Sequence, residues 1–208
     1  MSKNKTSRQW VHDHINDPYV KQAQAQGYRS RAAFKLLQID ERDHLLGPGK
    51  VVVDLGSTPG GWSQVLARKV LPSGRVVAID LLPMEPVAGV HFVLGDFRED
   101  EPLQQLVAAL EGRQVDLVLS DMAPNLSGIA VTDQARSAHL MELALDFADR
   151  YLKTGGDMLV KVFHGTGFDA LRQTMQTLFQ SVQVRKPESS RDRSSEVYLL
   201  CRSRKGSP

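Results

Sequence analysis

Short apolar runs recur along the chain and predict the strands of a parallel sheet. Five of them are rich in β-branched and aliphatic residues and are almost continuously hydrophobic, as is typical of strands covered by helices on both faces. These runs are Val51–Leu55, Arg75–Asp80, Val90–Leu94, Val115–Ser120 and Met158–Phe163.

Segments of helical length separate these runs. We expect crossover helices at Ser63–Val70, Pro102–Leu110 and Asp133–Leu152, and a further helix within residues 28–36 that leads into the fold. Turns that contain glycine or proline, at residues 47–49, 72–74 and 154–156, punctuate the pattern. Strands that alternate with helices predict an α/β, doubly wound, mostly parallel sheet.

The pattern changes near the C-terminus. Val182–Lys186 and Val197–Arg202 are strand candidates, but the polar stretch 187–196 between them is too short for a usual crossover helix. We therefore expect a seven-stranded, Rossmann-like sheet that ends in an antiparallel hairpin. This ending is typical of the methyltransferase version of the doubly wound fold.

Length and composition fit one domain in a reducing compartment. A chain of 208 residues with 41% hydrophobic and 24% charged residues can bury a full core. No apolar run approaches the roughly 18–20 residues of a membrane span, and no secretory signal is visible. The lone Cys201 has no partner for a disulfide or a metal site. We expect a cytoplasmic monomer without a membrane or metal partner.

Charge is distributed unevenly along the chain. Residues 1–35 hold seven Lys or Arg against two Asp, and residues 184–208 hold seven against three acidic residues, although the net charge is only +2. Two basic ends around an acidic middle suggest a clamp for a polyanion. The alternative is that both ends are merely solvated. Our candidates for phosphate contacts are Arg29, Arg31, Arg191 and Arg193.

The turn after the first strand predicts the cofactor. It contains Gly56, Gly60 and Gly61, but in neither the GxGxxG nor the P-loop spacing. A pyrophosphate needs several free backbone N–H groups at a helix start, and Pro59 removes one. S-adenosylmethionine carries no phosphate and tolerates a proline there. Trp62 is expected to line the cofactor pocket, the alternative being that it packs beneath the first helix.

Two carboxylates follow the next strands in the predicted sheet. Asp80 ends the second strand, where it can accept both hydroxyls of a ribose in NAD or in S-adenosylmethionine. Asp96 follows the third strand and can accept from an adenine amino group, or it can cap a helix. Asp54 fits a supporting role in the turn rather than direct contact with a ligand.

Lys161 is the most informative single residue. It lies inside a strand that should be buried on both faces, where burial disfavours the charged form. A neutral amine near a substrate hydroxyl would be a general base. The alternative is a lysine that reaches solvent from a strand end.

The sequence disfavours methylation of a base. The turn at 120–125, SDMAPN, lacks the aromatic residue expected for methylation of base amino groups. Methylation at C5 of a base needs a cysteine nucleophile, but Cys201 lies in an apolar terminal strand and is interpreted as a core residue.

Several ordered motifs together resemble the FtsJ-type ribose 2′-O-methyltransferases. They are YRSRAAFKL at 28–36, DLGSTPGGWSQ at 54–64, SDMAPN at 120–125, LVKVF at 159–163 and RKPESSRDRSSEVYL at 185–199. The resemblance covers nearly the whole chain and implies a catalytic tetrad of Lys35, Asp121, Lys161 and Glu196. Within it we expect Lys161 to act as base or to orient the hydroxyl, with Asp121 and Glu196 holding it and Lys35 nearby.

The same resemblance implies the ligands. S-adenosylmethionine would be bound, and S-adenosylhomocysteine released, by Gly60, Trp62, Asp80, Asp96 and Asp121, with Gly56 in the same turn. Bacterial members of the family act on the large ribosomal subunit, which implies a uridine ribose in the A-loop of 23S ribosomal RNA as the methyl acceptor. The protein would thereby take part in ribosome maturation.

Two other functions each explain part of the sequence. A nicotinamide oxidoreductase would share the fold but needs a phosphate-binding glycine pattern that is absent. A noncatalytic ribosome-assembly factor would explain the basic ends but not a buried lysine.

We expect a basic, partly flexible, RNA-binding extension at residues 1–30, the methyltransferase domain at 31–202 and a flexible tail at 203–208.

Overall fold

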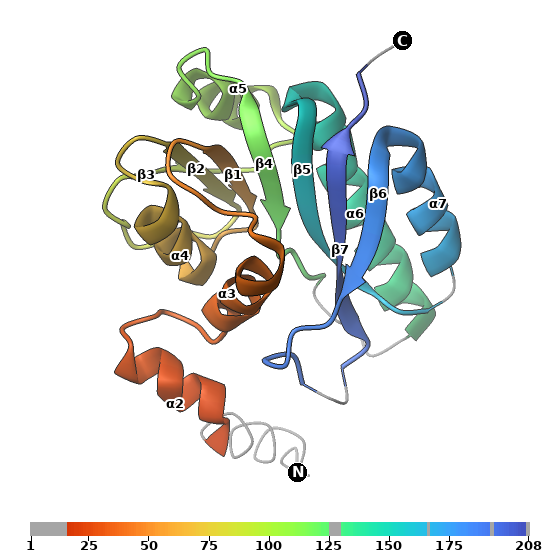
Figure 1. Cartoon of the computed structure of the whole chain (residues 1–208), viewed down its shortest axis with the longest axis horizontal. Coiled ribbons are helices and arrows are strands. Elements are labelled where there is room, and N and C mark those ends of the chain that lie inside the picture. Colours follow the sequence, from red (N-terminus) through yellow and green to blue (C-terminus); the bar gives the residue numbers. More distant parts are fainter. Residues whose placement is uncertain (1–15, 125–129, 166, 192–193, 207–208) are drawn as a thin grey trace, which may run out of the picture.

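The predicted seven-stranded sheet is confirmed by the computed structural model, which describes residues 16–124, 130–165, 167–191 and 194–206 (Figure 1). The strand order is β3-β2-β1-β4-β5-β7-β6. The strands are β1 (Val51–Leu55), β2 (Arg75–Asp80), β3 (Val90–Leu94), β4 (Val115–Ser120), β5 (Leu152–Phe163), β6 (Phe179–Arg185) and β7 (Glu196–Arg204).

The predicted hairpin is formed by β6 and β7, and β7 inserts between β5 and β6. Strands β1 to β5 pair in parallel, whereas β7 runs antiparallel to both of its neighbours. In this register Lys161 on β5 stands opposite Tyr198 on β7, and Phe163 stands opposite Glu196. The hairpin therefore brings its own side chains to the strand that carries Lys161.

Helices cover both faces of the sheet. They are α2 (Pro18–Ala25), α3 (Ala32–Asp43), α4 (Gly61–Val70), α5 (Asp100–Ala109), α6 (Ala130–Tyr151) and α7 (Phe168–Leu178). Alternate residues of one strand serve opposite cores: Val52 packs with α3 and α4, whereas Val51 and Val53 pack with the layer that contains α5, α6 and α7. This two-sided burial explains the continuous hydrophobicity of the strands.

Part of the basic N-terminal extension packs onto the domain. Asp17 caps α2 and Pro18 occupies its first position, a favourable pair of residues for a helix start. Ala23 and Tyr28 belong to the core beneath α3 and α4. The flexibility expected for part of the extension at 1–30 concerns mainly residues 1–15, and these lie outside the described residues.

The residues after Arg202 stay close to the sheet. Strand β7 continues to Arg204, and the N–H of Lys205 donates to the Leu178 carbonyl at 2.8 Å. Within the described part of the chain, none of the helices combines the length and the apolar character needed to cross a membrane.

Candidate active site

A cavity of about 780 Å³ opens at the carboxyl ends of the parallel strands, where an α/β sheet binds its ligand. Its volume falls in the range of small-molecule sites, which is about 300–1,000 Å³. The lining combines acidic and apolar side chains from four successive strand ends and α6. It includes Gly56, Thr58, Ile79, Asp80, Leu81, Leu82, Asp96, Phe97, Asp121, Met122, Pro124, His139 and Leu143.

The glycine turn brings the backbone close to this cavity. Gly56 has φ = 77° and packs against Met122, so a side chain there would be both strained and obstructed. Gly60, with φ = 104°, is the N-cap of α4, and no side chain caps this helix. The first backbone N–H groups of a helix lack intrahelical partners, so this helix start offers donors to a carboxylate.

Asp80 is held in place by the chain and still has acceptor capacity. Its Oδ2 accepts from the N–H of Thr58 at 2.8 Å and its Oδ1 from the N–H of Leu82 at 2.9 Å. A carboxylate offers about four lone-pair sites, so each oxygen can accept another hydrogen bond. Asp80 lines the cavity, as its predicted role with ribose hydroxyls requires.

Asp96 also lines the cavity and does not cap a helix. The N-cap of α5 is Glu99, so the alternative interpretation of Asp96 does not hold. Its Oδ1 instead accepts from the N–H of Arg98 at 2.9 Å, and the carboxylate pairs with the Arg98 guanidinium. Hydrogen bonding to this side chain lowers the pKa of Asp96, which keeps it an acceptor.

Trp62 lies in the core and not in the cavity lining, contrary to the predicted pocket position of its ring. The side chain belongs to the core under α3, where Nε1 donates to the Ala32 carbonyl at 2.7 Å. The indole also packs on Tyr198, with ring centroids 5.7 Å apart. Gly60, the N-cap of α4, is likewise absent from the lining, so the contacts of both residues with the cofactor stay predictions.

Asp54 supports the glycine turn from below. It is fully buried, and its Oδ2 accepts from the Ser63 hydroxyl at 2.8 Å while Oδ1 has no hydrogen-bond partner. Burial raises the pKa of Asp54 to about 7, and the negative charges of Asp121 and Asp80 add to the shift. Its predicted supporting place in the turn agrees with this geometry.

Lys161 is buried in β5 and does not reach solvent. Its side chain is only 6% exposed, which removes the alternative of a lysine that snorkels from a strand end. The Nζ atom lies 3.2 Å from Oδ1 of Asp121 and donates to the Asp121 main-chain carbonyl. Lys161 itself is not part of the cavity lining, but Asp121 is, so the buried amine adjoins the cavity through Asp121.

The other two residues of the expected tetrad form a second ion pair. Lys35, on α3, donates to Oε1 of Glu196 at 2.6 Å, and Ser190 donates to the same oxygen at 3.1 Å. Both charged side chains are nearly buried, at 13% and 12% exposure. The expectation that Glu196 holds Lys161 is therefore corrected: Glu196 holds Lys35, because β7 places it opposite Phe163.

Tyr198 joins the two ion pairs, and the sequence did not single it out. Its hydroxyl donates to Oδ1 of Asp121 at 2.7 Å, and Lys35 Nζ lies 5.9 Å from its ring centroid. Burial, together with the charges of Asp121 and Glu196, raises the pKa of Tyr198 well above its usual value, so the hydroxyl stays a donor. Only the pairing of β5 with β7 could have indicated it.

The candidate RNA-binding arginines occupy different environments. Arg29 donates to the main-chain carbonyls of Pro59, Glu85 and Pro86, so it fastens the turn after β1 to the β2–β3 connection. Arg31 is paired with Asp17, and Arg191 is 44% exposed. Arg193 lies outside the described residues.

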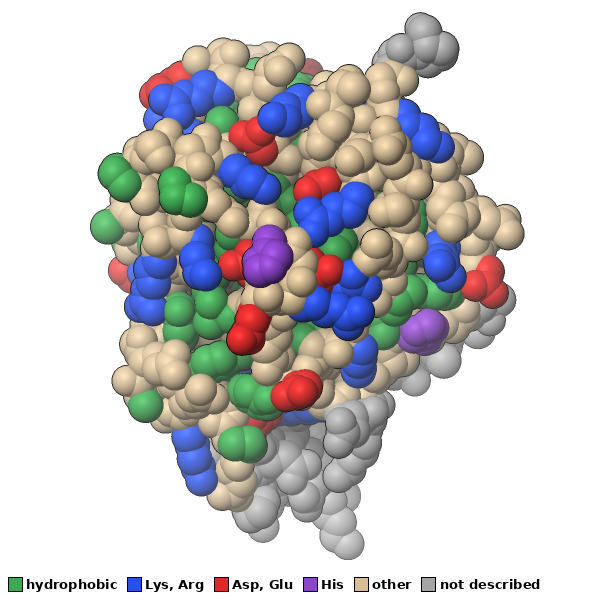
Figure 2. All heavy atoms as spheres, viewed as in Figure 1, with side chains coloured by type: hydrophobic (Ala, Val, Ile, Leu, Met, Phe, Trp, Pro, Cys, Tyr) green, Lys and Arg blue, Asp and Glu red, His purple; other side chains and the backbone are tan. Residues whose placement is uncertain are grey.

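The face of the molecule seen in Figure 2 is mixed in charge. Figure 2 shows basic and acidic side chains next to one another over its centre rather than a uniformly basic patch.

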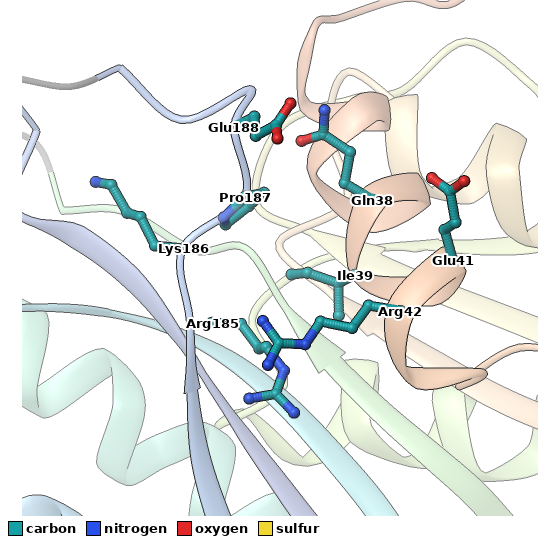
Figure 3. A pocket seen from close by; sticks show the side chains of 8 residues that line it. All are labelled: Gln38, Ile39, Glu41, Arg42, Arg185, Lys186, Pro187 and Glu188. Atoms are coloured by element: carbon teal, nitrogen blue, oxygen red, sulfur yellow. The ribbon is translucent and has the colours of Figure 1, made fainter.

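A second hollow of about 300 Å³ lies between α3 and the β6–β7 connection (Figure 3). It is lined by Gln38, Ile39, Glu41, Arg42, Arg185, Lys186, Pro187 and Glu188, and contains none of the predicted site residues.

Cys201 is buried, and its Sγ lies 3.5 Å from Sδ of Met175. Burial raises the pKa of the Cys201 thiol. This confirms its interpretation as a core residue.

Comparisons with known proteins agree with this architecture. A model of the FtsJ-like methyltransferase family matches residues 28–204. A ribosomal RNA large subunit methyltransferase E from Azoarcus sp. (strain BH72) is 63% identical over 200 residues, covering 96% of this chain and 98% of that protein. A protein of the same name from Burkholderia lata is 55% identical over 214 residues, covering 97% of each.

A solved structure gives the same result. A crystal structure assigned to a ribosomal RNA methyltransferase of Plasmodium falciparum superposes with a TM-score of 0.76 at 30% identity, covering 86% of this chain and 100% of that one. The chain belongs to the FtsJ-like methyltransferase family.

Proposed function

We propose that the protein transfers a methyl group from S-adenosylmethionine to the 2′-oxygen of a uridine ribose in the A-loop of 23S ribosomal RNA. The observation that carries the proposal is Lys161, a buried amine held by Asp121, which lines the cavity. The names of two similar relatives support ribosomal RNA of the large subunit as the substrate. Such a substrate implies a cytoplasmic protein active in ribosome maturation.

The cavity fits the cofactor in volume and in the chemistry of its donors and acceptors. Asp80 retains acceptor capacity for two ribose hydroxyls. Arg98 donates to both oxygens of Asp96, so Asp96 accepts from an adenine amino group once the exposed Arg98 side chain gives up one of these contacts. The uncapped start of α4 offers backbone N–H groups to the carboxylate of the amino-acid end. When bound, S-adenosylmethionine supplies a methyl group on a positively charged sulfur, which is a good leaving group.

The protein's own task is to position the ribose hydroxyl and to deal with its proton. An ammonium has three donors, and Lys161 uses two on the carboxylate and carbonyl oxygens of Asp121. The third position is left for the 2′-oxygen. As an ammonium, Lys161 orients the 2′-hydroxyl; to accept the hydroxyl proton it must first be the neutral amine, whose lone pair takes that proton and restores the ammonium. A positioned group of this kind contributes about 10²–10⁴-fold to a rate.

Tyr198 and the other two tetrad residues, Lys35 and Glu196, position the amine of Lys161. The hydroxyl of Tyr198 fixes the Asp121 carboxylate that holds Lys161. The Lys35–Glu196 pair packs against the same tyrosine and ties α3 to the start of β7. Two ion pairs joined by one buried ring keep the amine in a single orientation, and orientation supplies much of the rate in such a displacement.

Alanine in place of Gly56 is expected to weaken cofactor binding at least tenfold. A Cβ at this position would overlap the side chain of Met122, whose Cα would lie 3.3 Å away, on a backbone with φ = 77°. Gly112→Ala is the matched control, since its φ is 72° but nothing lies within 4 Å of an added Cβ. Calorimetric titration with S-adenosylhomocysteine measures the difference, and equal affinities for the two variants would refute the role of this turn.

Replacement of Arg191 by glutamine is expected to flatten the salt dependence of RNA binding. Arg191 is the most exposed of the three described candidate arginines, so a phosphate can reach it. Loss of one phosphate contact should reduce the slope of log affinity against log salt by about 0.7 for single-stranded RNA. Fluorescence anisotropy at several salt concentrations measures the slope; an unchanged slope would count against the contact.

The experiment that tests the function is a methyl-transfer assay with a labelled methyl donor and large ribosomal subunits that lack the modification. We expect label in the ribosomal RNA. A noncatalytic assembly factor would bind the particle without transfer, and a nicotinamide enzyme would bind NAD in a parallel titration; either result would contradict the proposal.

A further inference from the structure

Asp17 places a carboxylate between two arginines that we propose to contact RNA. Its Oδ2 accepts from Nη1 of Arg31 and lies 3.7 Å from Nε of Arg191. Its Oδ1 accepts from the N–H of Tyr19 at 3.0 Å and thereby caps α2. The Asp17 side chain is 9% exposed, so this ion pair is shielded from water on most sides.

This cluster adjoins the Lys35–Glu196 pair. Arg31 precedes Lys35 by four residues, so the two side chains share one face at the start of α3. Arg31 also donates to the Ser189 carbonyl, and the next residue, Ser190, donates to Glu196. An RNA strand whose ribose reaches the active site would therefore pass close to Arg31.

The β6–β7 connection that carries Arg191 is anchored beside α3. Figure 3 shows Gln38 on α3 facing the segment that contains Pro187 and Glu188. The Oε1 atom of Gln38 accepts from the N–H of Ser189 at 2.9 Å. Arg191 follows two residues later and is thus held on the same side of the molecule as Arg31.

The carboxylate does not saturate the two guanidinium groups. Among the described residues, Nε of Arg31 is buried without a hydrogen-bond partner, and the 3.7 Å separation of Asp17 from Arg191 is too long for a hydrogen bond. Burial, and then the like charge of Arg191, lower the pKa of Arg31, while the charge of Glu196 raises it. Within the described part of the chain, the three cations Arg31, Arg191 and Lys35 face the two carboxylates of Asp17 and Glu196, which leaves one excess positive charge and an unused donor.

We infer that Asp17 occupies the place of an RNA phosphodiester between Arg31 and Arg191 and competes with RNA for these two residues. A phosphodiester carries one negative charge and two free oxygens, so it can replace the carboxylate and accept from both guanidinium groups. The inference rests on the proposed RNA substrate. It assigns Asp17 the role of an internal competitor that lowers affinity for RNA.

The exchange requires little change in the fold. Val20 and Ala23 are buried and keep α2 docked on the domain through apolar contacts. Rotation of the Asp17 side chain would give up one capping hydrogen bond and the two ion pairs with Arg31 and Arg191. The phosphate would then take over the contacts with Arg31 and Arg191.

Asp17→Asn tests the competition while preserving the helix cap, because asparagine caps helices as well as aspartate does. Asp17→Ser is a second uncharged capping variant. The probe is a fluorescently labelled uridine-rich oligoribonucleotide, titrated at several salt concentrations. We expect roughly three- to tenfold tighter binding at low salt and a slope of log affinity against log salt that is steeper by about 0.7.

Asp146→Asn is the matched control, since it removes the same charge from an exposed pair on α6, far along the chain from this cluster. In an Arg191→Gln background, the gain from Asp17→Asn should fall by at least half. An unchanged or weaker affinity, a gain equal to that of Asp146→Asn, or a gain undiminished by Arg191→Gln would overturn the inference. Methyl transfer to large subunits by the Asp17 variants, measured in parallel, tests the proposed function separately.

Discussion

Lys161→Met is expected to lower kcat for methyl transfer by about 10²–10⁴-fold, the contribution of a positioned acid–base group. Methionine nearly preserves the length and the apolar packing of the side chain in β5 but removes the amine that Asp121 holds. Lys161 does not line the cofactor cavity, so affinity for S-adenosylhomocysteine should change less than about threefold. Single-turnover transfer to large subunits, combined with calorimetric titration, separates the two quantities.

The same strand offers a matched control. Lys153 also lies on β5, but it is 39% exposed and pairs with Asp116 away from the cavity. Lys153→Met should leave both transfer and cofactor affinity close to the parent values. Near-normal turnover in Lys161→Met would remove the amine from the mechanism, and an equal loss in Lys153→Met would point to a general effect on the sheet.

Asp54→Asn is expected to abolish a loss of about 4 kcal/mol in the free energy of unfolding that the parent protein undergoes between about pH 4 and 7. The loss arises because the pKa of Asp54 is about 7 in the folded protein against 3.8 in the unfolded chain. A carboxyl with a raised folded pKa favours the folded state while protonated. That contribution is complete below the unfolded pKa and is lost progressively as pH rises from about 4 to 7. Ser63 still has an oxygen to donate to in the variant, because asparagine keeps one side-chain carbonyl.

Denaturant unfolding of both proteins between pH 4 and 8 measures this effect. The free energy of unfolding of Asp54→Asn minus that of the parent should rise with pH and level off above pH 7. Ser63→Ala provides a second handle, since the Ser63 hydrogen bond lowers the pKa of Asp54 and its loss should move the upper end of the transition to higher pH. A stability difference independent of pH would show that Asp54 is ionised throughout.

The sheet could be predicted from the sequence because its central strands are buried on both faces. Val51–Leu55 and Val115–Ser120 begin and end as predicted, since each is an almost continuous apolar run. Strand β5 begins at Leu152, six residues before the predicted Met158, because the glycine-containing stretch 154–156 reads as a turn although it lies within the strand. Helices α2 and α7 were not predicted.

The candidate site could be predicted as a set of residues but not as a set of contacts. Lys161 stood out because a charge in an apolar strand is locally visible. Its partner Asp121 follows the neighbouring strand β4 and was expected. The register of β5 against β7 is fixed by no local pattern, so Glu196 was assigned to the wrong lysine and Tyr198 was overlooked. Trp62 follows the glycine turn directly, but the helix start directs its ring into the core.

Mapping the methyl group on the RNA tests the central claim most directly. Large subunits lacking the modification would be treated with the protein and a labelled methyl donor, and the RNA would then be partially hydrolysed in alkali. A 2′-O-methyl group blocks attack of the 2′-oxygen on the adjacent phosphodiester, so we predict one Lys161-dependent, alkali-resistant bond that follows a labelled uridine in the A-loop. Label on a base, or at a position that Lys161→Met modifies equally well, would contradict the account.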